Sequence, residues 1–113
     1  MKLGRVSSAA LMLSGISGVV APRSVAAALQ LTPQSDRGIA ETRAGLGGTY
    51  AALGGWALLS RDPTAQAAVG VTWLGAAAVR LASLKVDRPE TDLAFWGYLA
   101  AEIGFGATAL LSL

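Results

Sequence analysis

The sequence predicts an all-α integral membrane protein, a four-helix bundle with antiparallel up-down topology. Composition is the first reason, because 53% of the 113 residues are hydrophobic and only 14% are charged, against about 25% charged residues in an ordinary soluble domain. Charge spacing is the second reason. Charged residues divide the chain into four apolar stretches, each close to the ~20 residues that a helix needs to cross a bilayer. Residues 1–113 are therefore expected to form a single membrane domain.

The predicted spans cover residues approximately 4–21, 40–60, 64–84 and 91–112. Asp62 and Pro63 separate the second span from the third, and these residue types cap a helix and fit its first turn. Pro89 precedes the acidic residues Glu90 and Asp92, which favour the positive end of a helix dipole and predict the start of the fourth helix. Such short connections indicate that neighbouring helices run in opposite directions.

Two interpretations are open for the N-terminal region. Residues 1–27 fit a cleavable signal peptide, with Lys2 and Arg5 before an apolar run and small residues at its end. Cleavage would leave three spans. The serines and glycines of residues 6–20 favour a retained span instead, because small residues let membrane helices pack closely. Beyond this span, residues 25–29 are compatible with a short helical turn at the membrane interface.

The missing residue types limit the chemistry that the chain can perform. Cysteine and histidine are absent, which excludes disulfides, thiol nucleophiles, the usual zinc sites and His-ligated haem. We expect no enzyme activity, no metal and no cofactor. The net charge of +2 is spread along the chain, without the basic face of a nucleic-acid-binding protein. The expected partners are membrane lipid and other membrane-protein subunits, while the oligomeric state is open.

The composition also indicates a cellular location. Ala and Gly are abundant, and seven Arg residues outnumber two Lys residues, a pattern typical of GC-rich bacterial genomes. A multi-pass chain of this kind is expected in the bacterial plasma (inner) membrane.

An ionisable residue within an apolar stretch is the most informative site feature. Glu102 lies about ten residues into the last span, where a charge costs roughly 2.5 to 3.5 kcal/mol on insertion scales. Arg80 is its expected partner, and Glu41, Arg43 and Tyr98 are expected to complete an intramembrane polar cluster in the same leaflet. The cluster has two interpretations: an ion-pair network that fixes helix register, or a proton- or ligand-binding site. The first is favoured.

Glycines recur in the second and fourth stretches, where they predict close helix packing. The candidate packing residues are Gly47, Gly48, Gly54, Gly55, Gly97 and Gly104.

The chain resembles a bacterial membrane family through three motifs and an acid in the last helix. The motifs are Glu41-Thr42-Arg43-Ala44-Gly45-Leu46-Gly47-Gly48, Leu53-Gly54-Gly55 and Arg80-Leu81-Ala82-Ser83. They resemble the family catalogued as domain of unknown function 4345. The resemblance implies a four-helix membrane bundle similar to the DoxX-like proteins, and it implies no particular activity. Leu46 departs from the family, which often has an aromatic residue there, and the first span has no distinctive signature.

Three function classes follow from these features, in decreasing order of support. The first is a non-catalytic accessory or scaffold subunit of a larger membrane complex. The second is a small proton-coupled transporter that acts as a homo-oligomer, with Glu102 as its ionisable site. The third is a membrane enzyme, which is disfavoured because no nucleophile lies beside a base.

Overall fold

The computed structural model describes residues 3–113, which fold entirely into helices and their connections, with no strand in that range. The helices are α1 (Leu3–Val20), α2 (Pro22–Ala28), α3 (Asp36–Thr42), η1 (Arg43–Gly48), α4 (Thr49–Ser60), α5 (Pro63–Val86) and α6 (Leu93–Leu111). The predicted all-α class is confirmed. Residues 1 and 2, which include Lys2 of the signal-peptide interpretation and the start of the predicted domain, lie outside the described residues.

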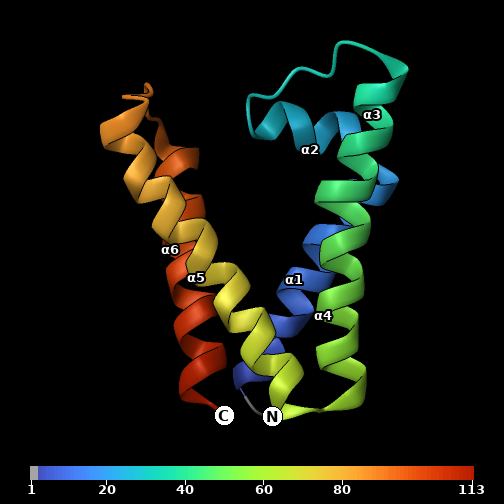
Figure 1. Ribbon diagram of the computed structural model, residues 1–113, viewed down its shortest axis with the longest axis vertical. Helices are drawn as coiled ribbons and strands as arrows, with labels where there is room; N and C mark the ends of the chain where they lie inside the picture. Colours follow the sequence, from blue (N-terminus) through green and yellow to red (C-terminus); the bar gives the residue numbers. More distant parts are fainter. Residues whose placement is uncertain (1–2) are drawn as a thin grey trace.

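The long helices form two pairs that alternate in direction along the chain (Figure 1). In one pair α1 packs against α4, and in the other α5 packs against α6. The pairs lie close together at the end of the molecule where α1 begins and the chain ends. They diverge toward the opposite end, where α3 continues the line of α4, α2 runs from the end of α1 toward the other pair, and the α5–α6 connection lies at the end of that pair.

Three helices are long and apolar enough to cross a membrane, namely α1, α5 and α6. The segment predicted as a span over residues 40–60 is divided instead into α3, η1 and α4. Its backbone stays right-handed helical through both junctions, with φ and ψ of −60° and −42° at Arg43 and of −56° and −50° at Thr49. The division is a change of hydrogen-bond register, because the Thr49 N–H bonds to the carbonyl of Ala44 five residues earlier, which is a π-helical spacing.

The helix starts follow the predicted chemistry closely. Asp62 accepts a hydrogen bond from the Thr64 N–H at 2.9 Å and caps α5, whose first residue is Pro63. Asp92 accepts from the Phe95 N–H at 2.9 Å. It therefore caps α6, which begins at residue 93, two residues later than predicted. The expected turn at residues 25–29 is the short helix α2, which directly follows α1 and turns across its end (Figure 1).

Glycines bring the backbone of α1 into direct contact with those of η1 and α4. A Cβ atom at Gly54 would lie 2.4 Å from the Met12 nitrogen, and one at Gly47 would lie 2.6 Å from the Val19 nitrogen. On the facing side of the contact, a Cβ atom at Gly15 would lie 2.0 Å from a backbone nitrogen. Two of the six predicted packing glycines, Gly47 and Gly54, therefore lie where helices meet.

The other four predicted packing glycines do not serve this role within the chain. A Cβ atom at Gly48, Gly97 or Gly104 would meet nothing within 4 Å, and one at Gly55 would meet only a flexible methionine sulfur at 3.8 Å. They make no close helix contact within residues 3–113, because a Cβ at each would meet open space or only a flexible side chain. Packing at these positions against another helix stays a prediction. Gly70 and Gly106 make the close contact between α5 and α6 instead.

The outside of the molecule is apolar. Large hydrophobic side chains on every long helix point outward, and Leu59, Val79 and Leu93 are 83%, 71% and 89% exposed. The buried core is small by comparison and centres on Leu11 and Val69. An exterior of this kind is rare on a soluble monomer and marks contact with lipid or with another protein.

Candidate functional site

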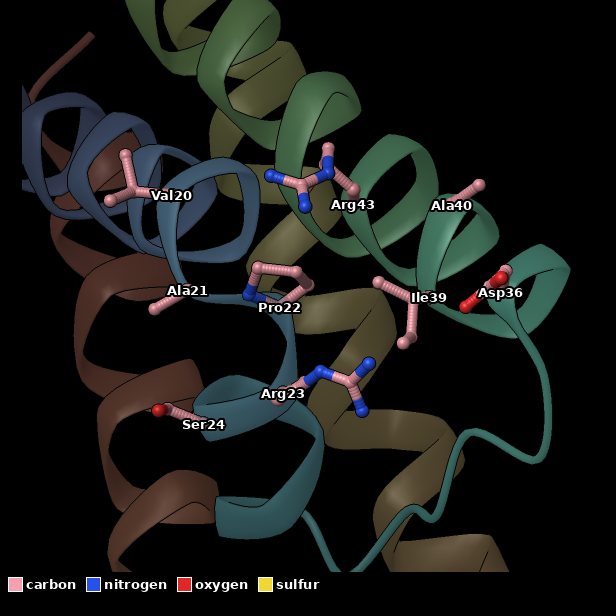
Figure 2. Close-up of a pocket in the computed structure, with 9 residues that line it drawn as sticks. All are labelled: Val20, Ala21, Pro22, Arg23, Ser24, Asp36, Ile39, Ala40 and Arg43. Atoms are coloured by element: carbon pink, nitrogen blue, oxygen red, sulfur yellow. The ribbon is translucent and has the colours of Figure 1, made fainter.

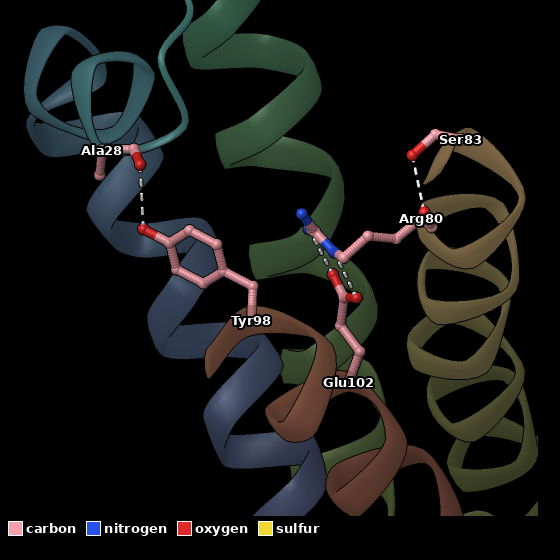
Figure 3. Close-up of polar contacts among 5 residues, drawn as sticks. All are labelled: Ala28, Arg80, Ser83, Tyr98 and Glu102. Carbon is pink, nitrogen blue, oxygen red and sulfur yellow. Dashed lines mark hydrogen bonds and ion pairs between the residues drawn. The ribbon is translucent and has the colours of Figure 1, made fainter. Parts of the chain in front are cut away.

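The site is an arginine and a glutamate that face each other across α5 and α6. Glu102 lies in the third turn of α6, and Arg80 lies in the C-terminal half of α5. Arg80 Nε donates to Glu102 Oε1 at 2.8 Å, and Arg80 Nη2 donates to Glu102 Oε2 at 2.8 Å (Figure 3). Both carboxylate oxygens are thus used in a fork-to-fork ion pair, the strongest arrangement of these two groups.

The pair lies inside the helix bundle. The Glu102 side chain is 9% exposed and the Arg80 side chain 22%. The guanidinium carbon lies 5.2 Å from the ring centre of Phe95 and 5.5 Å from that of Tyr98, within the range of cation–π attraction. The desolvation cost of the two charges is therefore offset by their mutual attraction, two hydrogen bonds and two aromatic faces.

Tyr98 and Ser83 tie the site to its surroundings. The Tyr98 hydroxyl donates to the carbonyl of Ala28 at 3.2 Å, which links α6 to the end of α2. Ser83 donates to the Arg80 carbonyl at 2.6 Å, one turn of α5 away. In Figure 3 the Tyr98 phenol points toward α2, whereas Arg80 and Glu102 point toward each other. The site therefore connects α2, α5 and α6.

Glu41 and Arg43 are not part of this cluster, so the predicted group of two acids and two bases is wrong. Glu41 pairs with Arg37 one turn earlier in α3, where the two side chains are 61% and 84% exposed. Arg43 Nη1 donates to the Val19 carbonyl at the end of α1. The physical reason is that α3 and η1 belong to the helix pair that diverges from α5 and α6 at this end (Figure 1).

A cavity borders the site on its open side. It has a volume of about 480 Å³ and lies between the C-terminal end of α2 and the facing ends of α5 and α6. Among the residues that line it are Arg80, Ser83, Tyr98, Gln30 and Asp92. Gln30 also donates to Asp92 at 3.3 Å across the outer edge. Arg80 and Tyr98 thus lie in the wall of this cavity, whereas Glu102 is not among the residues that line it.

Sequence reasoning missed a set of polar contacts between α1, α5 and α6. Ser7 donates to the Phe105 carbonyl at 2.7 Å, and Trp73 Nε1 donates to the Ser7 carbonyl at 3.3 Å. Gln66 donates to the Ala109 carbonyl at 2.8 Å. The sequence signal was a serine, Ser7, within an apolar stretch, because a hydroxyl in an apolar interior needs a partner. The structure buries Ser7 fully.

The polar groups of the site are used in contacts between helices, which can hold the helices in register. Between residues 3 and 113, no buried side-chain nitrogen or oxygen atom lacks a hydrogen-bond partner. Both carboxylate oxygens of Glu102 already accept hydrogen bonds from Arg80.

Comparison with known proteins tests the resemblance that the motifs predict. No curated protein and no solved structure matches the chain. The family model of the domain of unknown function DUF4345 matches residues 3–113, essentially the whole chain. The predicted resemblance is confirmed. The chain belongs to the DUF4345 family.

Proposed function

We propose that the protein crosses the bacterial plasma membrane four times as an antiparallel bundle and acts as a non-catalytic accessory or scaffold subunit of a larger membrane complex. The helices α1, α5 and α6 have the length and apolar character for three crossings. The fourth would be the helix formed by α3, η1 and α4, whose uncharged part, residues 44–60, meets the lower limit of roughly 17 residues.

The closed ion pair between Arg80 and Glu102 is the observation that carries the non-catalytic role. A catalytic acid or base has to reach a substrate proton, yet both oxygens of Glu102 are bound by the guanidinium and the carboxyl group is buried. This geometry supports a structural use of the pair, which fixes α5 against α6.

An outward face of small residues on α6 supports docking against another membrane helix. Gly97, Ala100 and Gly104 lie on one side of α6, and all three are exposed. A Cβ atom at either glycine would meet nothing within 4 Å. Because there is no hydrophobic driving force between helices in lipid, close backbone approach at small residues is a main source of helix association. We therefore place the partner on this face.

Extraction of the tagged protein at native expression, in mild detergent or nanodiscs, tests the proposal. Native gels and mass spectrometry should find a membrane protein that travels with it in fixed stoichiometry. Gly97→Leu with Gly104→Leu should remove that partner, since the large side chains block close approach without a clash inside the chain. The matched control is Gly75→Leu, an open position on α5. A wild-type protein that travels alone, or a partner that survives the α6 substitutions, would contradict the proposal.

A second candidate function is that of a small proton-coupled transporter acting as a homo-oligomer, with Glu102 as the ionisable site. It is favoured by the cavity of about 480 Å³ that Arg80 and Tyr98 line. Proton flux into vesicles that contain the purified protein should then be lost in Glu102→Gln. Glu41→Gln, which removes an exposed acid, should leave it unchanged. Equal flux in both variants would exclude this function.

A further inference from the structure

A second cavity lies at the corner where α1 ends and α2 begins. Its volume is about 480 Å³, and the facing wall comes from α3 and the first residue of η1. Figure 2 shows Arg23 on α2 and Arg43 on the facing helix, and both residues line the cavity. The Arg23 side chain extends toward Ile39, and the Arg43 guanidinium lies near the end of α1, where it bonds to the Val19 carbonyl. Ser24 follows Arg23 in the lining, but its hydroxyl points away from the Arg23 guanidinium.

The two arginines are available for a ligand. The ion pairs among residues 3–113 are those of Arg37 with Glu41 and of Arg80 with Glu102, so neither Arg23 nor Arg43 is paired there with a carboxylate. Arg43 uses Nη1 for the Val19 carbonyl, and a guanidinium has five N–H donors, so further donors remain. A guanidinium fork can bond two oxygens of one phosphate group, so each of these two arginines offers donors suited to a phosphate.

Asp36 is the acidic residue that lines this cavity. Its carboxylate lowers the positive charge of the site but does not cancel two arginines. Removal of this carboxylate should therefore strengthen the binding of an anion, whereas removal of the arginines should weaken it.

The position of the cavity indicates the kind of molecule whose phosphate group it would bind. The membrane-length helix α1 ends at Val20, which lines the cavity together with Pro22 and Ile39. The polar wall thus begins where the apolar helix ends. In a membrane that α1 crosses, the end of this helix would lie at the depth of the lipid headgroups. We propose that the cavity binds the phosphate group of an anionic phospholipid through Arg23 and Arg43. This inference rests on the proposed function, because it requires that α1 cross the membrane.

Native mass spectrometry of the full-length protein in detergent micelles tests the site with two probes, phosphatidylglycerol and inorganic phosphate. Arg23→Gln combined with Arg43→Gln should weaken phosphatidylglycerol binding by about tenfold or more, the effect expected for lost charge-assisted hydrogen bonds. Asp36→Asn should strengthen it. The matched control is Arg88→Gln, which removes one positive charge from the α5–α6 connection at the same end of the molecule but outside the cavity.

The two probes distinguish the sources of phosphate. Arginine-dependent binding of phosphatidylglycerol supports a lipid site, whereas arginine-dependent binding of inorganic phosphate alone would support a phosphate site and overturn its assignment to lipid. Binding of both probes at wild-type strength in the double variant would overturn the site. Extraction of membranes with alkaline carbonate separates this failure from that of the proposed function. Release of the protein by carbonate would overturn both the proposed function and the lipid site. If the protein stays in the membrane but its lipid binding does not depend on Arg23 and Arg43, only the lipid site is overturned.

Discussion

Replacing Arg80 by leucine should destabilise the folded protein by about 3 to 5 kcal/mol, the cost of leaving one member of a buried ion pair without its partner. The structure supports the upper part of this range. The substitution removes both 2.8 Å hydrogen bonds from a carboxylate that is 9% exposed. It also removes the guanidinium from the faces of Phe95 and Tyr98.

The reverse substitution, Glu102→Leu, should cost less. Arg80 is 22% exposed, and its long side chain can extend toward the polar end of the bundle while it keeps its aromatic contacts. The double variant with leucine at both positions should be close to wild type, because well-packed apolar residues often replace a buried ion pair without loss. The coupling between the two sites should therefore be several kcal/mol.

Unfolding in mixed detergent micelles, followed by the fluorescence of the three tryptophans, would measure these free energies of unfolding. The matched control is the exposed pair of Arg37 and Glu41, where a leucine substitution should change stability by no more than about 0.5 kcal/mol. If the losses of Arg80→Leu and Glu102→Leu simply add in the double variant, the two side chains do not interact and the reasoning fails.

Two further predictions concern helix packing and its polar contacts. Gly15→Ala should weaken the α1–α4 contact by more than 1 kcal/mol, on the order of other overpacked cores, because its Cβ would lie 2.0 Å from the Ala51 nitrogen. Gly45→Ala, at an open position, should not weaken the contact. An equal loss of unfolding free energy in the two variants, measured in the same assay, would contradict this prediction. Ser7→Ala should cost about 1 kcal/mol, since it removes the hydrogen bond to the Phe105 carbonyl. An unchanged free energy of unfolding would show that this bond does not contribute.

The ion pair was predictable because the sequence contains both an acid within an apolar stretch and a base that can reach it from the neighbouring helix. A charge within an apolar stretch needs compensation, and a short connection between antiparallel helices limits the candidates to residues at matching depth. Arg80 meets that condition for Glu102. The helix starts at Asp62 and Asp92 were predictable for a similar reason, since a cap depends only on residues that are neighbours in the chain.

What the sequence could not show is the direction in which each helix faces. Gly97 and Gly104 look like Gly15 and Gly54 in the sequence, but the first two lie outside the bundle and the last two lie at a helix contact. Nearly uniform apolar stretches carry too little periodicity to tell the faces apart. The divergence of the two helix pairs, which separates Glu41 from Glu102, likewise depends on packing over the whole chain.

The π-helical segment η1 was also beyond sequence reasoning. Residues 43–48 are rich in glycine, which indicates flexibility and close packing without fixing a hydrogen-bond register. Within this segment, Gly47 meets Gly18 and Val19 of α1. It divides a predicted single span into shorter helical pieces.

Four membrane crossings are the central claim of the proposed function, and site-directed labelling of single cysteines tests it most directly because the chain has no native cysteine. An impermeant maleimide applied to intact cells and to inverted vesicles should label Gln34→Cys and Thr91→Cys from one side of the membrane. It should label Arg61→Cys and Leu113→Cys from the other side. Labelling of Gln34→Cys and Arg61→Cys from the same side would show that the helix of residues 36–60 does not cross, and it would contradict the four-crossing bundle.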